Sequence, residues 1–151
     1  MQPHEKSVDQ IEGKAIEPPF LTPLVERIAR TRRVPLQQLS TEDLRLLIGQ
    51  RQGLPHVLHL ALARLEADPF LAGDMYAGDL LIGLLEAGVH WPPETVFRAR
   101  ARAIAERALE HLDTVVPTRW TEGELPEPGA LTEIDRDTLE PMLRQALTWL
   151  A

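Results

Sequence analysis

Two carboxylates and a phenol lie close together in one short stretch of the sequence. Asp74 and Asp79 are five residues apart with Tyr76 between them, in a segment that also contains Gly73 and Gly78. Paired carboxylates beside a tyrosine could transfer protons in general acid–base catalysis. Each residue also has a structural explanation, because Asp caps helices, Gly permits tight turns and a Tyr ring is readily buried. We therefore expect no catalytic residue here, and an enzyme that uses Asp74 or Asp79 stays an alternative.

Metal ligands and nucleophiles are the other groups that could do chemistry. His56 and His59 are three residues apart and could share a helix face, but Glu66 lies about two turns farther on, and a zinc site needs three or four converging ligands. Ser7 falls in a polar stretch and Ser40 is explained as a helix cap, so neither has the neighbouring base that a nucleophile requires. We expect no metal, no cofactor and no small-molecule substrate.

Composition narrows the function classes further. The chain has 151 residues, 44% of them hydrophobic, which suits one folded domain. Its 23 acidic and 16 basic residues give a net charge of −7, which argues against nucleic acid as a direct ligand and favours a basic protein partner. Because the chain lacks cysteine, a signal-peptide pattern and any long apolar run, we expect a cytoplasmic protein that does not enter a membrane.

The elements that must position these residues are helices. Apolar residues recur at helical spacing in six stretches, whereas Val115-Val116 is the sole β-branched pair that suggests a strand. The predicted helices cover residues 23–32, 41–50, 54–67, 80–87, 95–112 and 135–150. We expect an all-α fold: a single-domain bundle of about six helices over residues 20–151, with a mobile N-terminal arm over residues 1–19 that contributes little to the fold.

Helix boundaries and packing follow from local signals. Thr22-Pro23 and Ser40 with Asp43 are typical helix starts, Asp68-Pro69 is a typical helix end, and either Asp74 or Asp79 could cap the helix that begins near residue 80. Helices 41–50 and 54–67 should form an antiparallel hairpin, onto which the last helix docks. Leu24 and Val96 are expected in the buried stripes of their helices.

Several of these segments together resemble a protein family. The stretches are Leu44-Arg45-Leu46-Leu47-Ile48-Gly49-Gln50, Gly53-Leu54, Ala61-Leu62, Asp68-Pro69 and Gly73-Asp74-Met75-Tyr76-Ala77-Gly78-Asp79-Leu80-Leu81, followed by Trp91. In this order and spacing they resemble immunity proteins of contact-dependent growth inhibition systems, over about Thr41 to Trp91. The resemblance implies a cytosolic antidote that binds and neutralises the C-terminal toxin domain, frequently a nuclease, of a cognate effector.

The resemblance does not identify the residues that touch the toxin. The motif positions are expected to be structural, and they are Gly49, Gln50, Gly53, Asp68, Pro69, Gly73, Asp74, Tyr76, Gly78 and Asp79. From Asp113 to Ala151 the sequence has eight acidic residues and only three arginines, so an acidic surface there could bind a basic toxin. We predict that the toxin-binding residues are Trp120, Glu122, Glu124, Glu127, Glu133, Asp135 and Asp137, with the Asp74 to Asp79 connector as the rival surface. A small acidic helical adaptor or regulator of another cytosolic protein is the alternative function.

Overall fold

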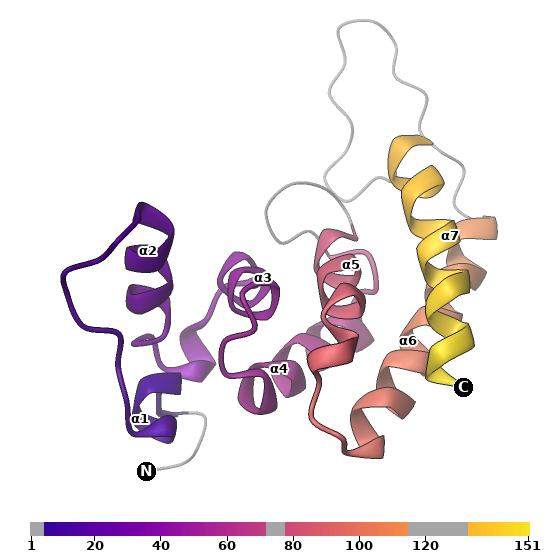
Figure 1. Cartoon of the computed structure of the whole chain (residues 1–151). Coiled ribbons are helices and arrows are strands. Elements are labelled where there is room, and N and C mark those ends of the chain that lie inside the picture. The colour runs from indigo at the N-terminus through magenta and orange to yellow at the C-terminus, as the bar shows by residue number, and fades with distance from the viewer. Residues whose placement is uncertain (1–4, 72–77, 115–132) are drawn as a thin grey trace, which may run out of the picture.

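The computed structural model describes residues 5–71, 78–114 and 133–151, and for residues 113–114 and 133–138 only the backbone. These residues form seven α-helices and two short 3-10 helices, with no strand. In Figure 1, α1 (Val8–Glu12) and α2 (Pro23–Thr31) lie at one end of the molecule and α6 (Thr95–Thr114) and α7 (Glu133–Leu150) at the other. Between them lie α3 (Thr41–Gly49), α4 (Leu54–Ala67) and α5 (Asp79–Glu86), and α3 packs against both α4 and α5. The prediction of an all-α bundle is confirmed. No described helix is long and apolar enough to span a membrane.

The predicted capping signals set the starts of α2 and α3. The Thr22 hydroxyl accepts a hydrogen bond from the Val25 amide, at 3.1 Å, and Pro23 is the first helical residue. At α3 the Ser40 hydroxyl accepts a hydrogen bond from the Asp43 amide, and the Asp43 carboxylate accepts one from the Ser40 amide. This reciprocal pair is a complete capping box. These bonds satisfy amides that have no partner within the helix, which is why the helices begin where the sequence predicts.

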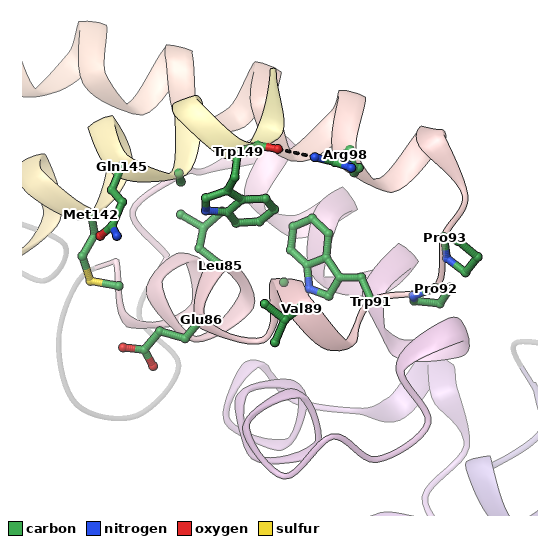
Figure 2. A pocket seen from close by; sticks show the side chains of 12 residues that line it. Leu85, Glu86, Val89, Trp91, Pro92, Pro93, Arg98, Met142, Gln145 and Trp149 are labelled. Carbon is green, nitrogen blue, oxygen red and sulfur yellow. Dashed lines mark hydrogen bonds between the residues drawn. The ribbon is translucent and has the colours of Figure 1, made fainter.

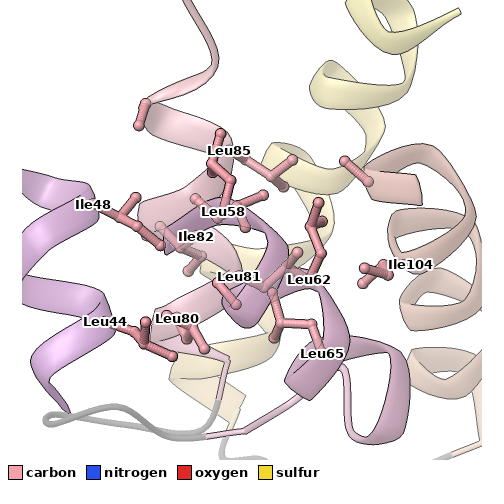
Figure 3. Close-up of a cluster of buried hydrophobic side chains, with 14 of the residues drawn as sticks. Leu44, Ile48, Leu58, Leu62, Leu65, Leu80, Leu81, Ile82, Leu85 and Ile104 are labelled. Carbon is pink, nitrogen blue, oxygen red and sulfur yellow. The ribbon is translucent and has the colours of Figure 1, made fainter. Parts of the chain in front are cut away.

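The core lies where α3, α4, α5 and α6 meet. Leucines and isoleucines from all four helices point into one cluster in Figure 3, and most of them are fully buried. Helix α5 contributes most densely, because its residues are apolar on nearly every side: Leu80, Leu81, Ile82, Leu84 and Leu85 are all buried. Its central position follows from this composition.

The N-terminal segment contributes more to the fold than the sequence suggests. Ser7 and Gln10 close a capping box on α1, and the Val8 side chain is only 1% exposed. The Arg32 guanidinium, itself buried, donates to the carboxylates of Asp9, at 2.7 Å, and Glu12, at 2.5 Å. The prediction that residues 1–19 contribute little to the fold is therefore wrong for Ser7 to Glu12; the boundary between residues 1–19 and 20–151 stays a prediction.

Arg32 stays charged although it is buried. Burial lowers the pKa of Arg32, but hydrogen bonds and charge interactions with Glu12 and Asp9 outweigh it, and the pKa is raised above its ordinary value. A third hydrogen bond, to the side-chain oxygen of Gln52 at 2.8 Å, extends the cluster to the turn between α3 and α4. One arginine thus joins three separate stretches of the chain.

Two other expectations need correction. Helix α7 packs mainly against α6 and to a lesser extent against α5, whereas it was expected to dock onto the pair formed by α3 and α4. One face of α6 packs against α4, and another face of α6 remains for contact with α7. Leu24 and Val96 are exposed. The buried face of α2 carries Ile28 and Ala29 instead, and that of α6 carries Phe97 and Ala101.

Candidate protein-binding site

Most of the predicted toxin-binding residues lie outside the described residues. These are Trp120, Glu122, Glu124 and Glu127. Glu133, Asp135 and Asp137 lie in the first turns of α7, where the structure describes the backbone. This acidic surface stays a prediction.

Two charged residues from separate motif segments meet in an ion pair. Arg45 of α3 places its Nε atom 3.3 Å from a carboxylate oxygen of Asp79, and the Asp79 side chain is 0% exposed. Asp79 is the first residue of α5 and Gly78 is its N-cap, so the expectation that Asp74 or Asp79 caps this helix is wrong. A buried carboxylate at a helix N-terminus is favoured by the helix dipole and by its arginine partner. Asp74, Tyr76 and Gly73 lie outside the described residues.

Two motif glycines adopt backbone conformations that other residues disfavour. Gly53 has a φ of +61° and Gly78 a φ of +90°. A Cβ atom at either position would also lie 2.8 Å from a side-chain carbon, of Val8 or of Leu139 respectively. Both positions therefore require glycine for conformation and for space.

The remaining motif residues mark helix ends. Gly49 and Gln50 close α3 and are exposed, the Asp68 carboxylate accepts from the Phe70 amide at 3.0 Å, and Pro69 is buried. The structural role of the motif as a whole stays a prediction.

An apolar groove is the feature of the described residues best suited to bind a partner. It has a volume of about 690 Å³ and runs between the end of α5, with the 3-10 helix η3 (Gly88–His90), and the last turns of α7 (Figure 2). Its apolar lining comes from both walls and includes Leu85, Val89, Trp91, Met142, Ala146 and Trp149. Volumes of this size are typical of binding sites that enclose a ligand or a partner's side chains.

Two tryptophans form the floor of the groove and are held firmly. The Trp91 indole N–H donates to the carbonyl of Leu84 at 3.1 Å. Its ring meets that of Trp149 edge to face, with centroids 5.5 Å apart and planes at 64°. A Cβ atom on Gly88 would overlap the Trp149 ring, so the absence of a side chain at this position lets α7 approach η3. The apolar floor is therefore built before any partner arrives.

Opposite charges stand at the two ends of the groove. Arg98 of α6 donates a hydrogen bond to the backbone carbonyl of Trp149, while Glu86 lies at the far end (Figure 2). Glu86 is exposed and forms no ion pair within the described part of the chain. It also borders a smaller, polar hollow of about 340 Å³ that Arg45 and Arg51 help to line.

Sequence reasoning missed the groove. Trp91 was predicted only as a motif position, and no role was predicted for Trp149. The signal that could have found the site is the run Val89-His90-Trp91-Pro92-Pro93, in which large apolar side chains stand beside two helix-breaking prolines. The groove also needs α7, which begins about 40 residues later at Glu133, and the register of α7 against η3 cannot be read from the sequence.

His56 and His59, which were considered as metal ligands, do not line the groove. The His59 ring packs on Phe97, with centroids 4.6 Å apart, and lies beside Arg100. Among residues 5–71, 78–114 and 133–151, no group of three or more acidic or histidine side chains could hold a metal ion.

Comparison with known proteins identifies a family. The sequence model of the family described as CDI immunity proteins matches residues 10–95, which is more than half of the chain. No curated protein and no solved structure matches. The matched segment runs from α1 to the first residue of α6, so it includes α5 and η3 on one wall of the groove but not α7 on the other.

Proposed function

The chain belongs to the family of CDI immunity proteins, and we propose that it protects the cell that makes it by binding the C-terminal toxin domain of its cognate effector. The family match over residues 10–95 carries this proposal. Neutralisation by contact needs an exposed, preformed surface, and the apolar groove provides one. In this proposal the protein acts as a stoichiometric binder in the cytoplasm, with no catalytic step and no cofactor.

Charge supports a basic toxin, such as a nuclease. The chain carries −7 at neutral pH with a pI of about 5.2. Proteins that cleave nucleic acid need positive surface to hold phosphates, and an acidic antidote would be drawn to that surface. Opposite net charges accelerate encounter and make it sensitive to salt. The acidic segment from Trp120 to Asp137 remains our proposed electrostatic contact.

The direct test is co-expression in bacteria. The toxin domain encoded beside the gene for this chain is induced alone, with this chain, or with an unrelated acidic protein of similar size and charge. Survival is scored, and the tagged toxin is purified at about 0.1 M and about 0.5 M salt to detect a complex. The higher salt concentration shortens the distance over which exposed charges interact, so it should weaken an electrostatic contact.

The proposal predicts that cells survive when the toxin is co-expressed with this chain but not when it is co-expressed with the unrelated acidic protein. It also predicts a complex that weakens at high salt. Killing that continues despite soluble, folded immunity protein would refute it. Survival without any complex would refute direct binding, and would favour a regulator that acts on another cytosolic protein.

A further inference from the structure

We propose that the apolar groove between α5–η3 and α7 is a docking site for the toxin domain, and that it receives an apolar side chain carried next to a basic residue. The apolar group would lie on the tryptophan floor, and the basic residue would lie against Glu86. This inference rests on the proposed function and adds to it the surface and the chemistry of the contact.

The side chains of the groove are those that dominate protein interfaces. Tryptophan, methionine and arginine are enriched in such contacts, and a few buried aromatic anchors usually supply most of the binding energy. The groove offers Trp91, Trp149 and Met142, with Arg98 at its rim. Val89 adds an aliphatic side chain that is 88% exposed, at a place where covering it would remove apolar surface from water.

The rigidity of the groove favours binding. Trp91 is anchored by its hydrogen bond to Leu84, and Trp149 is confined by its contact with Gly88 and by Arg98, which binds its carbonyl group. Less conformational entropy is lost when a partner binds side chains that are already ordered.

Charge identifies the occupant. The exposed Glu86 is the acidic group at the groove, and Arg98 at the other end already donates to a carbonyl of its own chain. A second copy of this chain would bring a further −7 to this surface, which like-charge repulsion opposes. A basic partner is attracted by the same net charge, and a basic side chain that lies against Glu86 is at the opposite end of the groove from Arg98.

Two matched pairs of variants of the full chain test the inference. Val89→Ser removes an exposed apolar side chain from the groove, and Leu21→Ser removes one that is 89% exposed just before α2, at the opposite end of the molecule. Glu86→Lys and Glu26→Lys make the same change in net charge, at the groove and on α2 respectively. Binding to a catalytically inactive form of the toxin domain encoded beside this gene is measured by calorimetry, and thermal unfolding checks each variant.

We expect Val89→Ser and Glu86→Lys each to raise the Kd about tenfold, which is the effect of losing one buried aliphatic group or one favourable charge contact. Leu21→Ser should leave it within about twofold, and Glu26→Lys should alter it much less than Glu86→Lys. Co-expressed with active toxin, the groove variants should protect less well than their controls.

Two results would overturn the inference. The first is unchanged affinity of both groove variants while the wild-type chain binds and protects, in which case the proposed function stands and only the docking site is wrong. The second is a wild-type dimer that Val89→Ser converts to a monomer, which would assign the groove to a second copy. Absence of binding by the wild-type chain would instead refute the proposed function itself.

Discussion

Substitution of Val8 and Gly53, singly and together, tests whether the N-terminal segment is part of the folded domain. Gly53 is the N-cap of α4 and has a φ of +61°. A Cβ atom at this position would lie 2.8 and 2.9 Å from the two methyl carbons of Val8 but 3.5 Å from its Cβ atom. Val8→Ala would remove both methyl carbons and leave only the ordinary 3.5 Å contact. The two substitutions should therefore compensate each other in part.

The magnitudes follow from this geometry. Val8→Ala deletes two buried methyl groups and leaves a small cavity, and should lower the free energy of unfolding by about 2 kcal/mol. Gly53→Ala should lower it by about 3 kcal/mol, of which about 1 comes from the left-handed conformation and the rest from overpacking against Val8. In the double variant the overpacking disappears, so we expect a total of about 3 kcal/mol instead of the additive sum of about 5.

Urea unfolding followed by circular dichroism measures all four proteins of this cycle. Leu21→Ala is the control, because this side chain is exposed and lies in the same part of the chain; it should change stability by less than about 0.5 kcal/mol. Additive effects of the two substitutions, or a loss below about 0.5 kcal/mol for Val8→Ala, would refute the conclusion that α1 is packed onto the domain.

Three further substitutions probe the interior and the groove. Asp79→Asn should lower the free energy of unfolding by about 3 kcal/mol, because it leaves Arg45 without its buried counter-charge, and a loss under about 1 kcal/mol in urea would contradict the ion pair's importance. Arg51 has a φ of +59°, so Arg51→Gly should raise stability by about 0.5 kcal/mol, and a drop in the urea midpoint would show that its side chain makes a contact worth more than the strain. Gly88→Ala should displace the Trp149 ring, shift the tryptophan emission and lower stability by about 2 kcal/mol; an unchanged emission spectrum would argue against the close approach of α7 to η3.

The parts of the fold that depend on local interactions could be predicted from the sequence. Ser40 with Asp43, Thr22 with Pro23, and Asp68-Pro69 act within one turn of the helix end they define, so the residues themselves carry the information. The central position of α5 followed from its composition in the same way. Helix α1 was missed because it has only five residues and a single buried apolar side chain, too few for a periodic pattern to emerge.

The site depends on long-range packing, which composition does not specify. The sequence pointed to acidic residues because charge can be counted, whereas the groove arises where η3 meets α7, and the rotation of each helix decides which side chains reach it. Val96 shows the difficulty: it fits a helical apolar stripe, yet packing rotates it to the surface and buries Phe97. An exposed apolar residue on one element becomes a binding feature only when the neighbouring element is placed.

Helix α5 and the residues just beyond it combine buried core positions with exposed positions at the groove, which bears on how such a protein could change its partner. Leu80, Leu81 and Leu84 are fully buried and join the helix to α3 and α4, whereas Glu86 at its end and Val89 just beyond it are exposed. Substitutions of exposed residues usually change stability by no more than about 0.5 kcal/mol, whereas loss of a buried leucine costs several. The groove can therefore acquire a different charge or shape while the core keeps the helices in place. In this arrangement, the exposed positions of the surface that we propose for toxin recognition, such as Glu86 and Val89, can diverge without loss of the fold.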